Sequence, residues 1–372
     1  MKKQKTIEYF DIHKLLTEYP GAWCFICIGG RGIGKTYSAL KMMMDDSEKF
    51  VFVKRQIDDV TYLCAGNGSF GSKPKIDENG KRISADLSPF VPLNRDLGTN
   101  IQAWSIMKGL GGFWQATPDG EPAGPLIGYV AALAGVSKYK GFDMSDANYM
   151  IFDEFIPQPW DRVNRREGEM ILDLHKTVSR DRIQRGRGPL KLLALANATE
   201  VNSPLTRVLE VTDDLAFMAM HNIRHKYIEE RGIVLQLLET PETFLEAEKD
   251  SIVYKALATT AWGEMAFGNT FAYNDMSNVS REKMRGFLPW FTVMYKRNKW
   301  YCYQHPDGRV FVTTSAFNAR MPAFDFAKEN DQKRYFRDIF YDMKQAVTDG
   351  LASFETYTMY DVLVNFKQFY KV

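Results

Sequence analysis

The sequence has 372 residues, of which 45% are hydrophobic and 25% are charged, and its formal net charge is +2. A chain of this length can bury the cores of one large and one smaller domain, and its weak charge means that any contact with nucleic acid must come from local basic patches. It has no run of eighteen apolar residues, and its basic start leads into a mixed segment, so we expect neither a signal peptide nor a membrane partner.

The first predicted elements surround a glycine-rich loop. Residues 1–21 predict a short helical lead-in, 22–28 a buried strand and 37–44 a helix. Between strand and helix lies Gly29-Gly30-Arg31-Gly32-Ile33-Gly34-Lys35-Thr36, which matches the phosphate-binding pattern G-x-x-x-x-G-K-[ST] at every constrained position. Its glycines let successive amides and the helix N-terminus point at one anion, here a triphosphate.

This loop predicts ATP and Mg²⁺ as cofactors. Lys35 is expected to reach the β- and γ-phosphates, and the hydroxyl of Thr36 to hold the metal. An ordinary glycine turn that carries Lys-Thr is the alternative, which the flanking strand and helix disfavour. The predicted nucleotide-binding residues are Gly29, Gly30, Arg31, Gly32, Ile33, Gly34, Lys35, Thr36 and Tyr37. Cys24 and Cys27 precede the loop, but residues three apart on a strand leave opposite faces, so we expect reduced core thiols.

The next stretch is less regular. Residues 50–53 predict a second strand, with Lys54 and Arg55 at its carboxyl end on the nucleotide side of the sheet. Residues 65–100 are rich in Gly, Ser, Pro, Asp and Lys and predict an irregular surface insertion. Residues 126–134 form a third apolar segment and predict another strand.

Asn148-Tyr149-Met150-Ile151-Phe152-Asp153-Glu154 supplies the second half of the predicted site. The apolar residues predict a buried parallel strand, and ligands of open α/β sheets bind where such strands end. We expect Asp153 to complete the magnesium shell opposite Thr36. Glu154 is suited to polarising the attacking water. A strand that ends in solvent is the alternative, and the loop upstream favours ATP hydrolysis.

A polar helix over 165–179 and a strand over 190–196 follow, so the pattern predicts a parallel sheet covered by helices on both faces. Asn197, at the end of the last strand, is placed to contact a γ-phosphate or its attacking water, or else to cap a turn. Before that strand come four arginines, Arg180, Arg182, Arg185 and Arg187. They fit a solvated turn, a nucleic-acid contact, or an arginine that completes a neighbour's ATP site.

Beyond residue 204 the chain changes character. Charged helical stretches predict a helical connector over 208–250, where His221 and His225 have the spacing of a helical metal pair but no third ligand near. From 251 a second domain is predicted, with strands over 289–295, 299–303 and 309–314, a hairpin turn at 306–308, and helices over 331–354 and 357–370.

The predicted strands of this second domain contain no carboxylate, and only Asp307 lies among them, in the hairpin turn. A two-metal nuclease site needs several carboxylates on strand ends, so no nuclease activity is expected. Basic and aromatic residues alternate there: Lys296, Arg297, Lys299 and Arg309 with Trp300, Tyr301 and Tyr303. They fit a contact to nucleic-acid phosphates and bases, or solvated charges between core aromatics.

Four motifs together resemble the DNA-packaging ATPases, or terminase-like motors, of small tailed bacteriophages with protein-primed genomes. They are the phosphate loop, Ile-Phe-Asp-Glu-Phe at 151–155, Ser-Arg-Asp-Arg at 179–182 and Leu-Ala-Asn-Ala at 195–198. The resemblance is detailed over about 22–205 and weak but collinear to the end. It implies an α/β P-loop ATPase domain (1–207) of the additional-strand, catalytic-glutamate type. The connector (208–250) and a small RNase H-like vestigial nuclease domain (251–372) would follow.

The resemblance also implies roles for single residues. It places the catalytic glutamate at Glu154, a trans-acting arginine at Arg180 with Arg182 two residues on, and a regulatory lysine at Lys140 or Lys138. The predicted catalytic set is thus Glu154, Lys35, Arg180, Arg182 and Asn197, with Thr36 and Asp153 on the metal.

The expected function is that of an ATP-driven motor that moves double-stranded DNA into a preformed capsid. The resemblance implies a pentameric ring on the capsid portal, in the host cytoplasm, and in some members a packaging RNA. A nucleotide-dependent switch that regulates by binding is the alternative from another class. An ATPase that remodels nucleic acid outside any capsid is a third possibility.

Overall fold

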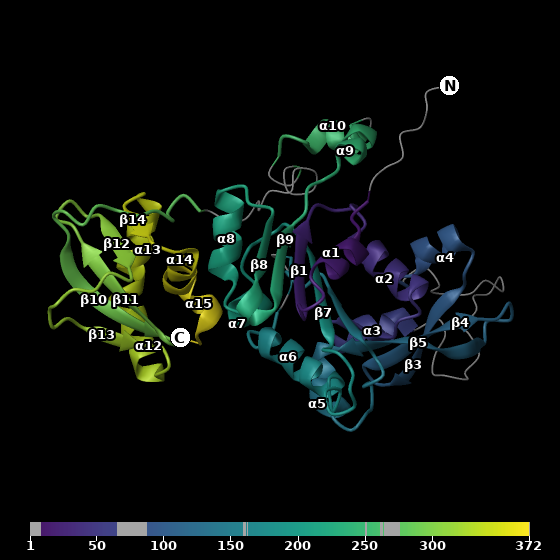
Figure 1. The fold of residues 1–372 in the computed structure, drawn as a ribbon. Helices are drawn as coiled ribbons and strands as arrows, with labels where there is room; N and C mark the ends of the chain where they lie inside the picture. The colour runs from purple at the N-terminus through teal and green to yellow at the C-terminus, as the bar shows by residue number, and fades with distance from the viewer. Residues whose placement is uncertain are drawn as a thin grey trace. The chain divides into compact units, whose positions relative to one another are not determined.

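The structure is a computed structural model that describes residues 9–64, 88–158, 161, 163–249, 251–260, 263 and 276–371. The chain divides into two compact units (Figure 1). The first unit comprises Met1–Leu209 and His221–Ala272, and the second comprises Glu210–Met220 and Tyr273–Val372. Each unit is built on a sheet of its own, of nine strands in the first and five in the second.

The sheet of the first unit has the strand order β3-β4-β5-β2-β6-β7-β1-β9-β8. Its strands are β1 (Cys24–Gly29), β2 (Phe50–Lys54), β3 (Ile101–Met107), β4 (Leu110–Ala116), β5 (Pro122–Ala132), β6 (Tyr149–Asp153), β7 (Lys191–Asn197), β8 (His225–Ile228) and β9 (Ile233–Leu237). The six from β5 to β9 in this order pair in parallel, whereas β3, β4 and β8 pair antiparallel with their neighbours. The expected parallel sheet is therefore the centre of a mixed one.

The first unit also contains helices. They are α1 (Ile12–Glu18), α2 (Lys35–Asp45), α3 (Ile57–Cys64), α4 (Val91–Leu97), α5 (Val136–Tyr139), α6 (Glu167–Val178), α7 (Pro204–Val208), α9 (Glu242–Glu248) and α10 (Ile252–Leu257). Of these, α9 and α10 stand away from the sheet in Figure 1. Local chemistry sets their starts: the Asp11 side chain accepts from two amides in the first turn of α1, and Ser203 with Thr206 forms a capping box on α7. No helix in the described ranges is long and apolar enough to span a bilayer.

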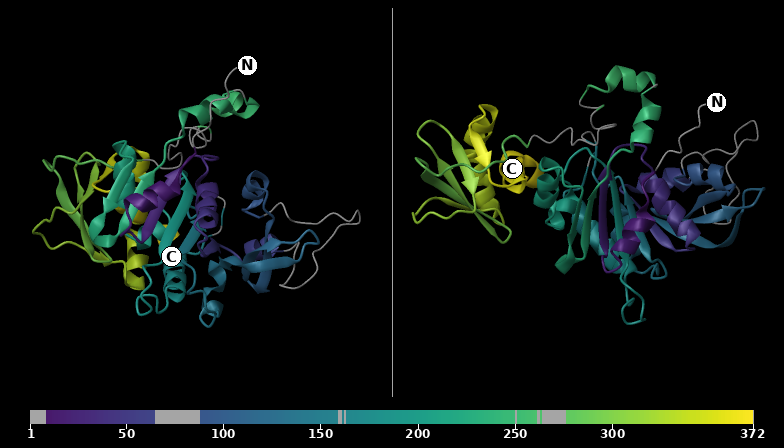
Figure 2. Two further views of the ribbon diagram at one scale, coloured as in Figure 1. Left: turned by 45° about the vertical axis from the view of Figure 1, so that its right-hand side comes forward. Right: turned by 45° about the horizontal axis from the view of Figure 1, so that its top comes forward.

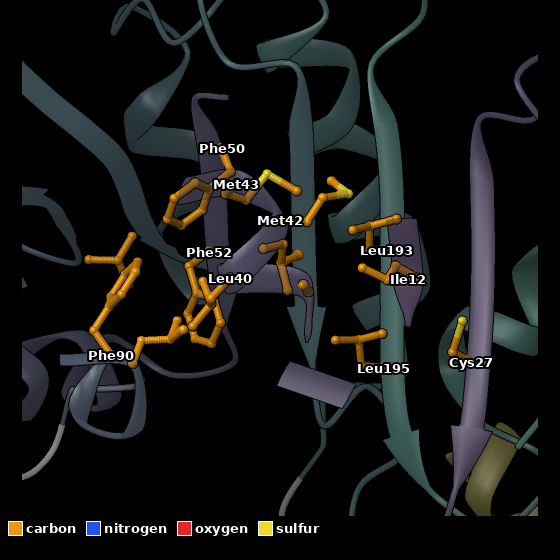
Figure 3. Close-up of a cluster of buried hydrophobic side chains, with 14 of the residues drawn as sticks. Ile12, Cys27, Leu40, Met42, Met43, Phe50, Phe52, Phe90, Leu193 and Leu195 are labelled. Carbon is orange, nitrogen blue, oxygen red and sulfur yellow. The ribbon is translucent and has the colours of Figure 1, made fainter. Parts of the chain in front are cut away.

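The main core lies between one face of the sheet and helices α1 to α4. Figure 3 shows side chains of β1, β2 and β7 on this face, among them Cys27, Phe52 and Leu193, beside Ile12 of α1 and Leu40 of α2. Alternate residues of a strand point to opposite faces, and the other set, such as Ile26 and Met150, is buried as well. Each such side chain contributes about 1.5–3 kcal/mol. The sheet is therefore packed on both faces, and its loops emerge from a rigid edge.

The second unit has the strand order β13-β10-β11-β12-β14. Its elements are α8 (Thr212–Met220), β10 (Leu288–Tyr295), β11 (Asn298–Gln304), β12 (Val310–Thr313), β13 (Ala323–Asp325), α12 (Glu329–Asp338), α13 (Phe340–Thr348), β14 (Ala352–Phe354), α14 (Tyr357–Val364) and α15 (Phe366–Phe369). Helices α12 to α15 pack against one face through an aromatic core that includes Phe291, Tyr335 and Phe366 (Figure 2). The other face carries a smaller cluster of Phe287, Tyr303 and Phe311.

Several predictions of elements were wrong. The connector predicted as helical contains β8 and β9, and β9 pairs in parallel with β1, so this stretch completes the first sheet. Charged flanks hid the apolar run of β9. Helix α4 lies in the stretch predicted as irregular, where its Leu93 is buried; residues 65–87 of that stretch lie outside the described residues. The predicted helix over 331–354 ends before Gly350, whose φ of +68° is left-handed, and continues as β14.

Candidate active site

The glycine-rich loop joins β1 to α2 at the carboxyl edge of the first sheet. Gly32 and Gly34 have φ of +76° and +88°, a conformation that side chains rarely adopt. A Cβ atom on Gly29 would lie 2.7 Å from Cβ of Leu238, so this glycine is needed for packing. The loop thus folds tightly at the start of α2, an eleven-residue helix whose first amides are free to bind an anion.

Lys35 lies inside this loop and is only 8% exposed. Its Nζ donates to the carbonyl oxygens of Gly29 at 3.1 Å and Gly30 at 2.5 Å, and to Oδ1 of Asn197 at 3.3 Å. Burial lowers the pKa of Lys35 to about 8, against the opposing effect of Asp153. The oxygens that accept from Nζ are neutral, and burial disfavours the charged form of Lys35. A bound anion would stabilise that charged form, so this lysine is suited to bind phosphate.

Thr36 and Asp153 meet across the sheet, as the motif spacing predicted. The Thr36 hydroxyl donates to Oδ2 of Asp153 at 3.0 Å, and the amide of Glu154 donates to Oδ1 at 3.1 Å. Burial raises the pKa of Asp153, while the charge of Lys54 and the hydrogen bond from Thr36 lower it. A hydroxyl beside a carboxylate suits Mg²⁺, which binds proteins through few oxygen ligands and shares the rest of its shell with phosphates and water.

Glu154 follows directly and is exposed at the same edge. Its φ is +56°, unusual for a residue with a side chain. With Asp153, Lys54 and Arg55 it lines a cavity of about 790 Å³. A carboxylate at the wall of a solvent-filled cavity is where a water-activating base is needed.

Strand β7 lies between β1 and β6, so Asn197 lies between the phosphate loop and Asp153. Its side-chain amide oxygen accepts from Lys35, which favours a role at the site over a turn cap. The structure therefore brings together Lys35, Thr36, Asp153 and Asn197, with Glu154 beside them.

The arginine run lies elsewhere. Helix α6 begins at the carboxyl edge of the parallel strands, where Glu167 contacts Arg55. It ends at the opposite edge, where β7 and β1 begin. There His175 contacts the backbone oxygen of Leu190 and the ring of Trp23. The helix thus crosses the sheet, and Arg180, which follows it, lies at the edge opposite its own phosphate loop. There it lines a second cavity of about 790 Å³.

The two predicted catalytic arginines differ in their surroundings. Arg182 is 4% exposed and donates to backbone oxygens of Ser145, Ala147 and Gly188 and to Oδ1 of Asn148. Every guanidinium nitrogen of Arg182 is engaged within this chain, which favours a structural role and makes Arg180 the better candidate for action in trans. Arg180 is exposed and donates to the backbone oxygen of Lys140.

The remaining candidates are placed as follows. Lys138 and Lys140 are exposed, and Lys140 lines the cavity of Arg180, not that of Glu154. Cys24 and Cys27 are buried free thiols, as predicted. His221 follows α8 and His225 lies on β8, so they share no helix. No group of three or more His, Cys, Asp or Glu side chains in the described ranges is arranged to hold a metal ion.

Sequence patterns missed three residues at the site. Phe244 of α9 and Tyr9 lie against Gly32 and Gly34 of the phosphate loop, and neither belongs to a recognisable motif. Glu167 is buried beside Arg55, and its place on the apolar face of α6, in line with Ile171 and Leu174, is the signal that could have marked it.

No family model and no curated protein matches the sequence. Two solved structures match nearly the whole chain. One is the viral genome packaging motor assembly of bacteriophage phi-29, at 16% identity and a TM-score of 0.59, with 98% of this chain and 100% of that chain covered. The other is the phi-28 gp11 DNA packaging motor, at 19% identity and a TM-score of 0.60, with 99% of each chain covered. The chain therefore shares the fold of these packaging-motor proteins over nearly its whole length.

Proposed function

We propose that this protein is an ATPase that drives double-stranded DNA into a preformed viral capsid. The observation that carries the proposal is the contact of Thr36 with Asp153, beside Glu154, within a chain that has the fold of two packaging motors throughout. A nucleotide site occurs in many classes of protein, and one fold can host many activities. The proposal therefore rests on the site and the fold together.

The roles follow from the geometry. The loop amides and Lys35 bind the phosphates, and Thr36 with Asp153 would hold Mg²⁺, which would offset the charge that develops on the phosphates. Glu154 takes a proton from the attacking water. The place of β7 between β1 and β6 supports the additional-strand class of P-loop ATPases, and Glu154 next to Asp153 supports the catalytic-glutamate assignment.

Arg55, which lines the cavity of Glu154, is held by protein oxygens, and Arg31 of the phosphate loop donates to Oε1 of Gln158. Arg180 lies at the opposite edge of the sheet. We therefore propose a head-to-tail ring, pentameric as in the resembling family, in which Arg180 of one subunit completes the site of the next. The ring would bind DNA and the capsid portal, with Lys140 beside Arg180 at the subunit boundary, and a packaging RNA remains an additional proposed partner.

The second unit supports a scaffold or nucleic-acid-binding role. Its RNase H-like origin is a proposal that rests on the strands β10 to β12 in antiparallel order with β13 parallel to β10. Lys299 lies over the ring of Tyr301 and Lys296 over that of Tyr295, so these basic residues are associated with aromatic faces at the surface.

The test is ATP turnover by the purified protein, with and without double-stranded DNA, followed by packaging of DNA into empty procapsids. We expect sustained turnover, stimulation by DNA and DNA protected from nuclease inside the capsid. Binding of ATP without repeated turnover would favour the nucleotide switch instead. DNA-stimulated turnover without packaging would favour the ATPase that acts outside a capsid.

A further inference from the structure

The two cavities at opposite edges of the first sheet carry opposite charge. Among the described residues, five carboxylates and two lysine or arginine side chains line the cavity of Glu154. In the same described part of the chain, four lysine or arginine side chains and one carboxylate line the cavity of Arg180. Complementary patches on two different surfaces of one chain favour head-to-tail association of copies of that chain.

Each cavity wall also presents a large apolar side chain to solvent. Tyr62 of α3 is 64% exposed at the wall of the Glu154 cavity. Ile183, in the turn that follows α6, is 84% exposed at the wall of the Arg180 cavity. Single exposed apolar side chains are common on protein surfaces. These two differ from others because they lie on the two walls that a head-to-tail contact through Arg180 would bring together.

The turn that carries Ile183 is fixed before any partner arrives. The amide of Gly186 donates to the backbone oxygen of Ile183 at 3.0 Å, which closes the turn. The buried Arg182 ties it to the backbone of residues 145–147. Ile183 follows Arg180 by three residues, so both side chains would reach a neighbouring subunit on one preformed segment. A preformed segment loses little conformational freedom when it binds.

Helix α3 supplies a matching surface. Asp58 and Tyr62 are four residues apart, so they lie on one face of the helix, and both are exposed. Val60 and Leu63 are buried in the core and fix the helix in place. The exposed face therefore offers an aromatic ring beside a carboxylate, which suits a partner with an apolar side chain beside a cation.

We propose that Ile183 of one subunit packs on Tyr62 of the next, with Arg185 of the same turn beside Asp58. This contact would hold Arg180 at the neighbour's ATP site. The partner is a second copy of this chain, because the acidic and the basic cavity walls belong to the same unit. The inference rests on the proposed function, since it specifies which surfaces meet in the proposed ring.

Cross-linking tests the contact directly in the full-length protein. The four native cysteines are buried, so Tyr62→Cys and Ile183→Cys each add one accessible thiol. With DNA, empty procapsids, Mg²⁺ and a non-hydrolysable ATP analogue present, a short bismaleimide should give no covalent dimer in either single variant. A mixture of the two should give dimers, and the double variant should give longer oligomers. Ile252→Cys replaces Ile183→Cys in the matched control, because Ile252 is 85% exposed but lines neither cavity.

Turnover at several protein concentrations separates docking from catalysis. Ile183→Asp should raise the Kd of self-association by about thirtyfold, the effect of removing a central interface residue. Its ATP turnover should therefore fall at low protein concentration and recover at high concentration. Arg180→Ala should remain inactive at every concentration, and Ile252→Asp should behave as the wild type does.

Charge reversal identifies the partner surface. Asp58→Arg places a cation opposite the basic turn and should weaken self-association, and Arg185→Asp in the same chain should restore it. Wild-type self-association in Asp58→Arg, or dimers in a single-cysteine variant alone, would overturn the inference. So would the absence of cross-links in the mixture of two active variants. Each of these results leaves the proposed ATPase standing, whereas a wild-type protein without ATP turnover would remove the proposed function itself.

Discussion

Both sheets end strands in aspartates, but their surroundings differ. In the first sheet, Asp153 at the end of β6 is half-buried, contacts Thr36 from the loop that follows β1, two strands away, and lies in the field of Lys35. In the second, Asp325 at the end of β13 is bonded by the nearby amide of Ala327 and by Lys328, and these contacts lower its pKa. An aspartate at a strand end becomes a site only where other segments supply partners for a ligand.

The same contrast shows what burial does to the charges. Burial disfavours the charged forms of Lys35 and Asp153, and a bound phosphate beside Lys35 and a bound metal beside Asp153 would stabilise those charges. Asp307 and Asp325 already have cationic partners within a few residues of the chain, Arg309 and Lys328. These two carboxylates have cationic partners without any ligand. We therefore expect substitutions at the first edge to change ATP turnover and substitutions of these aspartates to leave it unchanged.

The largest effect should come from Arg180, which we propose reaches this edge from a neighbouring subunit. An arginine finger contributes about three to five powers of ten to turnover, so Arg180→Ala should be nearly inactive while it still binds ATP. Steady-state hydrolysis and nucleotide binding measure the two quantities. A solvated turn would leave the variant active, and a DNA contact would remove only the stimulation by DNA and flatten the salt dependence of binding.

Mixing variants tests whether Arg180 acts across subunits. Arg180→Ala and Glu154→Gln are each expected to be inactive, but a mixed ring places intact Glu154 sites beside intact Arg180 donors. Activity should therefore reappear on mixing. Subunit exchange is first verified with labelled protein, and exchange without recovered activity would refute the assignment in trans.

The next largest effect concerns the carboxylate itself. Glu154→Gln should lower steady-state turnover by about two to four powers of ten, the usual contribution of a general base, and preserve ATP binding. Lys35→Ala should instead weaken binding, because it removes the cation inside the loop. Turnover and the Kd of a fluorescent nucleotide measured on both variants distinguish these roles. Near wild-type turnover in Glu154→Gln would mean that another group activates the water.

Some of this site could be predicted from sequence because its signals are local. The phosphate loop lies within eight consecutive residues, and Asp153 and Glu154 end an unbroken apolar run. Strands β3 and β4 were missed because β4 contains Gly111 and Gly112, which weaken a strand pattern. The structure needs them: a Cβ on Gly111 would lie 2.7 Å from the backbone oxygen of Trp104, and one on Gly112 would meet the ring of Trp114.

Contacts between residues that are far apart in the chain could not be predicted, because no local sequence pattern marks them. The Arg55–Glu167 pair joins residues far apart in sequence, and nothing local marks either as a partner. Arg180 and Arg182 are chemically alike in the sequence. In the fold, the backbone oxygens of Ser145 and Ala147 lie where they accept from Arg182, which is buried. Arg180 is exposed, and the sequence does not show this difference.

A smaller effect is expected in the pH dependence of folding. The pKa of Lys35 is lowered from 10.5 to about 8 in the folded protein, so between these values the unfolded chain binds more protons. The free energy of unfolding should therefore rise with pH across this window, by up to about 3 kcal/mol, and gain nothing from Lys35 below it. Denaturant unfolding of wild type and Lys35→Met at several pH values measures the difference. Other groups that titrate at alkaline pH contribute equally to both proteins and cancel in the difference. If the free energy of unfolding had the same slope against pH in both proteins, the lowered pKa of Lys35 would be contradicted.

The smallest effect should come from the aspartates of the second sheet. Asp307→Asn and Asp325→Asn are each expected to leave ATP turnover unchanged, and the full-length protein should not nick supercoiled plasmid in Mn²⁺. The reason is geometric: hydrolysis of DNA by two metals needs several carboxylates that converge, whereas each of these is occupied by a cation close in sequence. Glu154→Gln in the same assay shows whether any nicking depends on ATP hydrolysis. Nicking that needs Mn²⁺, persists in Glu154→Gln and is lost in Asp307→Asn or Asp325→Asn would place a nuclease in the second unit. In that case each of the two sheets would carry an active site, and the second unit would not be a scaffold alone.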